Sequence, residues 1–143
     1  MNSILVPALA NPPSRSLLLY ATPVRAGFPS PATDYIDQPI DLNALIVRDA
    51  AATFFLRVQG DSMRDAGILD GSRVAVEGGR QPASGDIVVA SLEGEFTLKR
   101  FHRSPRGCEL RPANPDYPVI RVPPGGDLQV FGVVVAVITR FLP

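Results

Sequence analysis

Two residues of the chain, Ser62 and Lys99, have the types that a nucleophile and its base require. Ser62 lies in a polar segment, residues 60–68, between stretches that are rich in apolar side chains. A serine hydroxyl is a poor nucleophile until a neighbouring base takes its proton. Lys99 is the only lysine beside thirteen arginines. Because arginine stays protonated at any working pH, an amine base would have to be Lys99.

Other catalytic pairings depend on His102 and Cys108, the only histidine and the only cysteine. A serine–histidine–aspartate triad would need His102, which lies in a charged stretch and which we interpret as a solvated surface residue. We interpret Cys108 as a small packed side chain. It cannot form an internal disulfide, which fits a reducing compartment. One histidine and one cysteine do not supply the ligands of a typical zinc site, so we expect no metal and no other cofactor.

The stretch around Lys99, residues 95–101, alternates as a β-strand does and places Lys99 on the same face as Thr97 and Phe101. A free lysine has a pKa of about 10.4, so only about one molecule in 2,500 is neutral at pH 7. Burial disfavours the ammonium form, and a pKa of about 7–8 would make Lys99 an effective general base. The alternative is an ordinary solvated lysine on a strand.

The segment that carries Ser62 has the signals of a single helical turn. Asp61 or Ser62 is a suitable N-cap, Gly67 is a suitable end, and Gly60 allows other backbone to come close. Free backbone N–H groups at the start of such a turn suit an oxyanion. The alternative is that Ser62 only caps the turn.

The elements that would position these residues are short strands. From residue 54 onward, β-rich stretches alternate with turns that contain glycine, at a spacing of about 10 residues. This pattern predicts a mainly β fold, a distorted sandwich or partly closed barrel, rather than βαβ units. The predicted strands cover residues 54–58, 73–76, 86–92, 95–101, 108–111, 119–122 and 129–140. Before them, residues 40–52 are expected to form a short helix or turn that begins near Asp41 or Asn43.

Proline marks the N-terminal part of the chain, where seven of the fifteen prolines precede residue 40. A segment this rich in proline lacks the N–H donors of an interior strand or a long helix. We therefore predict an extended arm over residues 1–39 and a β-rich domain over residues 40–143. Gly27 is the only glycine of the arm, whereas the other eleven lie at or after Gly60.

The charge balance and the apolar pattern limit the classes of function. Fourteen basic and fourteen acidic residues give a formal net charge of zero. Nothing in the composition therefore favours direct sequence-specific DNA binding. The longest apolar stretch, residues 130–139, has about half of the roughly 20 residues that a membrane span needs. The start lacks the positive region of a signal peptide, so we expect a cytoplasmic protein with no membrane contact.

The motif Gly60-Asp61-Ser62-Met63, with Lys99 37 residues after the serine, resembles the LexA/UmuD family of self-cleaving Ser-Lys peptidases. Four further stretches match that family in order and spacing: residues 67–71, 85–90, 94–99 and 130–134. The resemblance covers about residues 20–141. It implies the LexA/UmuD-type peptidase fold. It also implies that Ser62 is the nucleophile, that Lys99 is its base, and that the backbone N–H groups of Asp61, Ser62 and Met63 hold the oxyanion.

The resemblance also implies a substrate, the chain's own arm. Residues 26–35 look like the cleavage-site arm of the UmuD branch, which places the cut between Ala26 and Gly27. Members of that branch often have cysteine before the scissile glycine, and Ala26 is chemically permissive at this position. Only 26 residues precede the cut, with prolines among them. That is too few for the helix-turn-helix domain of the LexA branch, so the UmuD branch is favoured.

What the resemblance implies about biology is a role in tolerance of DNA damage. A homodimer would cut itself when a RecA filament on single-stranded DNA stabilises the reactive pose of the arm. The trimmed dimer would then serve a UmuC-like Y-family polymerase in error-prone translesion synthesis during the SOS response. Two alternatives remain open at this point. One is a non-catalytic interaction module of the same fold, and the other is an autoprocessed transcriptional regulator.

Overall fold

The computed structural model describes residues 6–7, 17–20, 26 and 36–142. These residues form a mainly β fold, as predicted, with one short α-helix, α1 (Leu42–Ile46), and one 3-10 turn, η1 (Arg64–Ala66). The strands are β1 (Val6–Pro7), β2 (Leu17–Tyr20), β3 (Ile36–Ile40), β4 (Thr53–Arg57), β5 (Arg73–Gly78), β6 (Ile87–Leu92), β7 (Glu95–Ser104), β8 (Gly107–Arg111), β9 (Ile120–Val122) and β10 (Leu128–Ile138).

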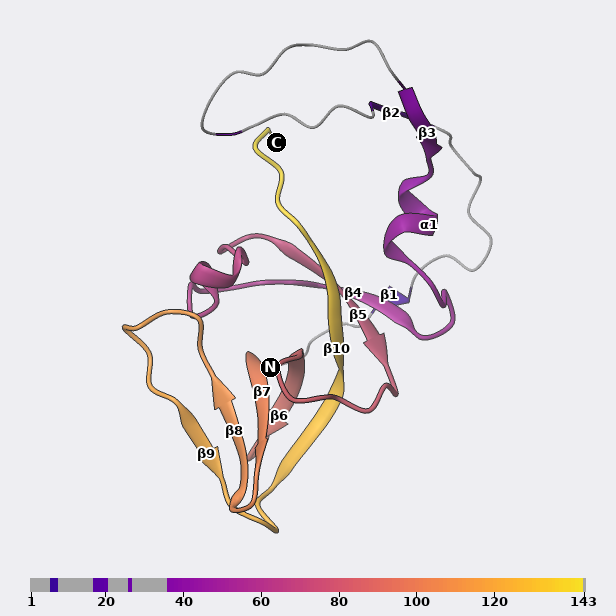
Figure 1. The fold of residues 1–143 in the computed structure, drawn as a ribbon. Coiled ribbons are helices and arrows are strands. Elements are labelled where there is room, and N and C mark those ends of the chain that lie inside the picture. Colours follow the sequence, from indigo (N-terminus) through magenta and orange to yellow (C-terminus); the bar gives the residue numbers. More distant parts are fainter. Residues whose placement is uncertain (1–5, 8–16, 21–25, 27–35, 143) are drawn as a thin grey trace.

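Eight of the described strands form one antiparallel sheet in the order β1-β4-β5-β10-β6-β7-β8-β9. The last strand, β10, therefore lies in the middle of the sheet, between β5 and β6 (Figure 1). Its pairing shifts register twice, between Val130 and Gly132 against β6 and between Val134 and Ala136 against β5. Such bulges bend a strand and increase its twist, so the two halves of the sheet curve around separate cores.

The two cores divide the sheet between its halves. One contains Phe101 and Leu110 and packs β6, β7, β8 and β10 together. The other contains Met63 and Ile68, each 2% exposed, against side chains of β5 and β6. Both residues come from the segment that carries Ser62, so the burial of their side chains holds that segment against the sheet.

Each of the seven predicted strands corresponds to an observed strand, with differences at the ends. The strand predicted over residues 95–101 continues to Ser104 because β7 and β8 pair as a hairpin as far as Ser104 and Gly107. The strand predicted over residues 129–140 ends at Ile138. The predicted helix is confirmed as α1, whose N-cap Asp41 accepts a hydrogen bond from the Asn43 N–H at 3.0 Å.

The described residues of the predicted arm include strands. β1 pairs with the edge of β4, with Val6 opposite Phe55, and β2 pairs with β3 in a separate two-stranded sheet. Pro7 lies in β1, which has a strand on one side only, and sheets tolerate proline at such edges. β3 ends at Ile40 and so crosses the predicted boundary at residue 39. The division into an arm and a domain stays a prediction.

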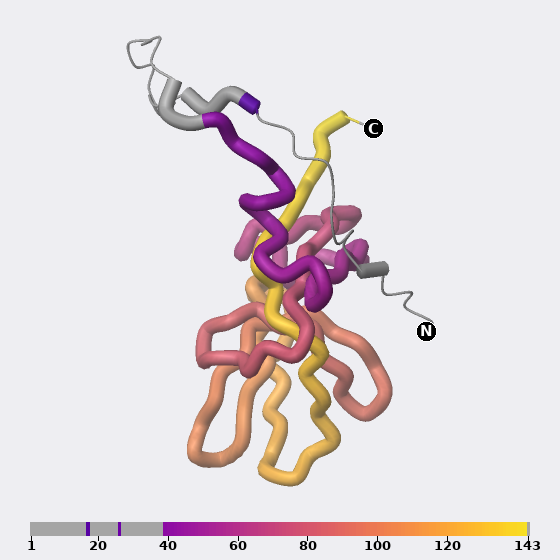
Figure 2. The backbone as a smooth tube through the Cα atoms, turned by 90° about the vertical axis from the view of Figure 1, so that its right-hand side faces the viewer, coloured from indigo at the N-terminus to yellow at the C-terminus, as the bar shows by residue number. Residues whose placement is uncertain are grey.

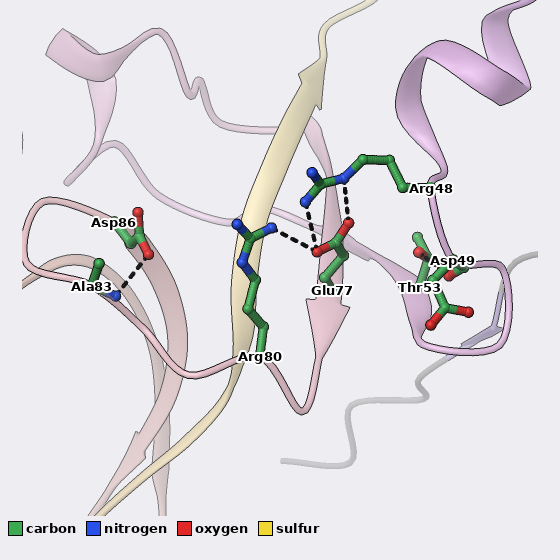
Figure 3. A network of polar contacts seen from close by, with 7 residues as sticks. All are labelled: Arg48, Asp49, Thr53, Glu77, Arg80, Ala83 and Asp86. Atoms are coloured by element: carbon green, nitrogen blue, oxygen red, sulfur yellow. Dashed lines mark hydrogen bonds and ion pairs between the residues drawn. The ribbon is translucent and has the colours of Figure 1, made fainter.

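An ion-pair cluster joins the segment after α1 to the central sheet. The carboxylate of Glu77 on β5 accepts two hydrogen bonds from Arg48, at 2.9 and 3.0 Å, and one from Arg80 at 2.9 Å (Figure 3). Beside it, the buried hydroxyl of Thr53 donates to the carbonyl of Asp49. The chain from α1 into β4 is therefore tied to β5 by charged groups as well as by strand pairing.

The described part of the molecule is elongated. Its hairpin turns lie at one end, and α1 and the C-terminal residues lie toward the other (Figure 2). Among the residues that the structure describes, no helix has the length and apolar character needed to cross a membrane.

Candidate active site

Ser62 lies on the loop that connects β4 to η1. The loop can turn sharply because Gly60 has a φ of +93°, a conformation that side-chain-bearing residues rarely adopt. The Gly60 N–H donates to the carboxylate of Asp70 at 2.7 Å, which closes the base of the loop. Ser62 itself is half-buried, and the next residue, Met63, is inserted into the core. The serine is thus placed at the boundary between the core and solvent.

The helical turn predicted after Ser62 is present as η1, but its cap differs from the prediction. Met63 is the N-cap residue and makes no side-chain capping bond, so the expected cap by Asp61 or Ser62 is wrong. The two side chains bind elsewhere. The Asp61 carboxylate accepts a hydrogen bond from the Tyr117 hydroxyl at 2.6 Å, and the Ser62 hydroxyl contacts Lys99. The predicted end is confirmed, since Gly67 is the left-handed C-cap with a φ of +84°.

Lys99 reaches Ser62 from β7, the strand that pairs with β6. Its Nζ lies 2.9 Å from Ser62 Oγ, 2.8 Å from Thr97 Oγ1 and 3.1 Å from the carbonyl oxygen of Leu98. Thr97 and Lys99 are two residues apart on one strand, which is why their side chains share a face. The side chain of Lys99 is thereby aimed at the serine by three polar contacts.

The burial of Lys99 shifts the ionisation of its side chain toward the neutral amine. The residue is only 9% exposed, and burial lowers the pKa of its ammonium group from the ordinary value of lysine. None of the three oxygens around Nζ belongs to a carboxylate that would stabilise the positive charge. A neutral amine 2.9 Å from a hydroxyl can accept its proton, so the arrangement is chemically able to activate Ser62 as a nucleophile.

A cleft of about 300 Å³ opens in front of Ser62 and Lys99. Its walls come from the end of β4 and the loop after it, from the start of β7, and from Val74 and Val89 of the core. Most of the wall is apolar, with Leu56, Val58 and Phe96 among the lining residues. The cleft is therefore suited to a narrow, largely apolar ligand.

Two further predictions concern the oxyanion hole at residues 61–63 and the cleavage site at residues 26–27. No described residue accepts a hydrogen bond from the backbone N–H of Asp61, Ser62 or Met63. Ala26 is an exposed residue, and its neighbour across the predicted cleavage site, Gly27, lies outside the described residues.

The two alternative catalytic residues lie apart from the cleft. His102 and Cys108 are on the β7–β8 hairpin, and neither lines the cleft beside Ser62. Both are half-buried, so His102 is only partly solvated and Cys108 is only partly packed. Within the described ranges, no three His, Cys, Asp or Glu side chains are grouped so that they could hold a metal ion.

Three residues contact the site in ways that the sequence did not indicate. Thr97 contacts the amine of Lys99, and the alternation of the strand did place it on the same face. Asn114 and Tyr117 belong to the loop between β8 and β9, and both contact Asp61 from more than fifty positions away. Such loop-to-loop contacts have no periodic signal in the sequence, although the two prolines that flank residues 113–114 indicate a rigid loop.

Comparison with known protein families decides the class of this molecule. Residues 18–135, which include the whole cleft, match the family described as Peptidase S24-like. The chain belongs to this peptidase family. The resemblance to the LexA/UmuD family that the sequence motifs indicated is confirmed by this match, and so is the corresponding class of fold.

Curated relatives are similar over most of the chain. Protein SamA of Salmonella typhimurium is 44% identical over 137 residues, which cover 96% of this chain and 95% of SamA. Protein ImpA of Escherichia coli is 46% identical over 122 residues, or 85% of this chain and 83% of ImpA. The LexA repressor of Delftia acidovorans is 44% identical over 115 residues, which are 80% of this chain but only 51% of the repressor.

Proposed function

We propose that the protein is a self-cleaving serine peptidase in which Ser62 is the nucleophile, Lys99 is the general base and the Ala26–Gly27 bond is the one cut. The observation that carries the proposal is the 2.9 Å contact between Lys99 Nζ and Ser62 Oγ, made by an amine whose pKa is lowered by burial. Membership of the S24 family supports peptide-bond hydrolysis as the reaction.

The first half of the reaction forms an acyl-enzyme. Neutral Lys99 accepts the Ser62 proton as Oγ attacks the carbonyl carbon of Ala26, and the carbonyl oxygen becomes an oxyanion. The backbone N–H groups of the Asp61–Met63 loop are the candidate donors to this oxyanion, because no described residue takes their hydrogen bonds. The Lys99 ammonium then gives its proton to the amide nitrogen of Gly27, and the peptide bond breaks.

The second half returns the enzyme to its starting state. Water gives a proton to neutral Lys99 and attacks the ester between Ser62 and Ala26. The ester bond breaks, Ser62 Oγ regains a proton from Lys99, and Ala26 becomes a new carboxyl terminus. Residues 1–26 are released from residues 27–143. Because the substrate is the protein's own arm, each arm is cut only once.

The walls of the cleft support a small residue before the cut. The space is about 300 Å³ and is lined mostly by apolar side chains, so a segment with short side chains can bring its backbone near Ser62. Ala26 has only a methyl group, and Gly27 has no side chain that would obstruct the approach. This argument supports the Ala26–Gly27 assignment through the chemistry of the cleft.

The wider role that we propose is that of an SOS mutagenesis factor. A RecA filament on single-stranded DNA would stimulate the cut, and the trimmed homodimer would serve as an accessory subunit of a UmuC-like polymerase in the cytoplasm. The similarity to SamA and ImpA over most of the chain supports assignment to this branch of the family.

The test of the peptidase activity needs only the purified chain. It is incubated at pH values from about 6 to about 10, and the products are identified by mass spectrometry. We expect slow cutting after Ala26 that becomes faster as Lys99 loses its proton. Replacing Ser62 by Ala or Lys99 by Ala should each lower the rate by roughly 10³-fold or more. Ser104→Ala, which changes an exposed serine away from the cleft, is the matched control and should cut as fast as the parent chain.

The outcomes separate the proposal from its alternatives. A chain that stays intact at every pH, with and without a RecA filament on single-stranded DNA, would contradict self-cleavage and favour a non-catalytic interaction module. A cut that depends on Ser62 but falls at another bond would contradict only the Ala26–Gly27 assignment. Specific retention of promoter DNA would favour the transcriptional regulator.

A further inference from the structure

Hydrogen bonds join the loop that carries Ser62 to the loop between β8 and β9. The side-chain amide of Asn114 donates to the carbonyl of Asp61 at 2.9 Å, and the Ala113 N–H donates to the carbonyl of Ser62 at 2.8 Å. In return, the Asp65 N–H donates to the Ala113 carbonyl at 2.8 Å. These three hydrogen bonds join two loops that are about fifty residues apart.

The first two of these bonds fix the orientation of two peptide groups. A trans peptide group is planar, with its C=O and its N–H pointing in opposite directions, and the described residues contain no cis peptide bond. The Asp61 carbonyl shares its plane with the Ser62 N–H, and the Ser62 carbonyl shares its plane with the Met63 N–H. Holding both carbonyls toward the β8–β9 loop therefore turns both N–H groups away from that loop.

We propose that Asn114 is a positioning residue for the oxyanion hole, and that together with the Ala113 N–H it orients the N–H groups of Ser62 and Met63. This inference rests on the proposed peptidase function, for which these N–H groups are the oxyanion donors. Asn114 would act through the peptide planes and would not itself touch the substrate.

The surroundings of Asn114 suit this role. The residue is 3% exposed, and its Oδ1 accepts hydrogen bonds from the Asp116 N–H at 3.0 Å and from the Arg64 guanidinium at 3.5 Å. With the oxygen facing these two donors, the amide nitrogen has to face the Asp61 carbonyl, so the orientation of the side chain is determined. Pro112 and Pro115 flank the short stretch and restrict its backbone.

Tyr117 makes a second contact from this loop to Asp61 but is less suited to positioning. Its hydroxyl donates to the Asp61 carboxylate at 2.6 Å, whereas Tyr117 is 41% exposed and its contact leaves the peptide plane of Asp61 untouched. We expect the replacement of Tyr117 by Phe to slow self-cleavage only a few-fold. Replacing Asn114 should slow self-cleavage more strongly, because Asn114 contacts the backbone carbonyl of Asp61.

The deciding experiment replaces Asn114 by Asp in the full chain. Aspartate keeps the size of the side chain and the acceptor for Asp116 and Arg64, but it has no N–H to donate to the Asp61 carbonyl. We expect the highest rate of self-cleavage, reached at alkaline pH, to fall roughly 10- to 100-fold. The midpoint of the pH profile should move little, because residue 114 does not contact Lys99 and the new carboxylate lies beside the Arg64 guanidinium. Asn43→Asp, an exposed change of the same kind on α1, is the matched control and should leave the rate unchanged.

A second measurement separates orientation from loss of structure. After a fluorophosphonate has labelled Ser62, a phosphoryl oxygen occupies the oxyanion position, and the amide proton resonances of Ser62 and Met63 should move downfield. In Asn114→Asp this movement should be smaller, at a temperature where both proteins are folded. If Asn114→Asp does not fold, Asn114→Ser, which retains a short hydroxyl donor, is measured in its place.

The possible results are distinct. If the parent chain cuts in a Ser62-dependent way while both Asn114 variants cut equally fast and show the same resonances, the positioning role is contradicted and the peptidase function stands. If the variants slow the reaction only by moving the pH midpoint, Asn114 acts on Lys99, and the proposed route through the peptide planes is wrong. If the parent chain does not cut or label at all, the proposed function fails first.

Discussion

Lys99 is a buried lysine, and its burial disfavours the charged form of the side chain. Because folding changes the pKa of Lys99, the stability of the folded protein depends on pH. The unfolded chain holds the lysine proton up to a pKa of about 10.4, whereas the folded chain releases it at lower pH because the residue is buried. Between the two pKa values the unfolded state binds more protons, so the stability of the folded protein rises with pH across that window.

Replacing Lys99 by Met should therefore stabilise the protein at neutral pH. Methionine fills a similar volume without an ammonium group, so it avoids the cost of burying a charge or of deprotonating the amine. Each tenfold change in proton affinity corresponds to about 1.4 kcal/mol. Urea unfolding of both proteins at several pH values would show the difference, which should shrink as the pH approaches 10.4. A variant that is less stable than the parent at pH 6 would contradict the sign.

The hydroxyl of Thr97 affects the pKa of Lys99 without itself accepting the proton of Ser62. Its hydroxyl oxygen lies 2.8 Å from Lys99 Nζ, and an acceptor at this distance stabilises the ammonium form. Thr97→Val keeps the shape and removes the acceptor, so the pKa of Lys99 should fall further and the pH profile of self-cleavage should move to lower pH. The highest rate should also fall, by roughly ten-fold, because one contact that aims the amine at Ser62 is lost. A profile that moves to higher pH would show that the hydroxyl donates to the neutral amine instead.

At the scale of elements, the hairpin of β6 and β7 places Lys99. Its two-residue turn consists of Glu93 and Gly94, which have φ values of +52° and +84°. Turns of this type match the twist of the strands, but they favour asparagine or glycine at the first position. Glu93 is the only non-glycine residue with a positive φ among the described residues, so the turn contains local strain.

Glu93→Asn should relieve that strain and raise the free energy of unfolding by about 0.5–1 kcal/mol. Asparagine tolerates the left-handed conformation because its short side chain can bond to nearby backbone. Denaturant unfolding at pH 7 measures the gain, and self-cleavage should be unaffected because the strand register is retained. Glu93→Gln is the matched control: it removes the charge without improving the backbone, so it should bring no gain. An equal gain in both variants would trace the effect to charge.

The elements show how far sequence reasoning reaches in this chain. Alternation and glycine turns are local signals, so they located the seven strands to within a few residues, and the capping residue Asp41 marked the start of α1 but not its end. They did not place β10 between β5 and β6, because strand order depends on contacts between residues far apart in sequence. The contact between Ser62 and Lys99 was accessible because lysine occurs once. The support from Asn114 was not, because an asparagine in a loop usually indicates a turn.

At the scale of the whole molecule, the Glu77 cluster connects the N-terminal segment to the sheet that carries the site. Arg48 follows directly after α1, and its two hydrogen bonds to Glu77 fix the chain at this point on β5 (Figure 3). Gly132 of β10 lies opposite Gly78, next to Glu77, where an added methyl group would come within 2.5 Å of the Glu77 carbonyl oxygen. This tight contact brings the strand backbones together at the place where the cluster is anchored. The chain is therefore held against the sheet at Arg48.

Glu77→Gln should destabilise the protein in a pH-dependent way. The hydrogen bonds from Arg48 are the largest cause that holds the pKa of Glu77 below its ordinary value. A carboxylate with a lowered pKa contributes stability above the pKa of the unfolded chain, about 4.3, and loses that contribution as the pH falls through its folded value. We expect a loss of about 2 kcal/mol at pH 7, measured by urea unfolding, and a smaller loss below pH 4.

Glu109→Gln is the matched comparison for this prediction. Glu109 also lies beside two arginines, Arg111 at 2.8 Å and Arg121 at 3.7 Å, but its own side chain is 22% exposed, against 11% for Glu77, and its second contact is longer. Pairs of exposed groups contribute little to stability, so this change should destabilise the protein much less than Glu77→Gln does. Equal losses in the two variants would mean that the Glu77 cluster is no stronger than a surface pair. In that case the strand pairing of β4 with β5 alone would hold the segment after α1 in place.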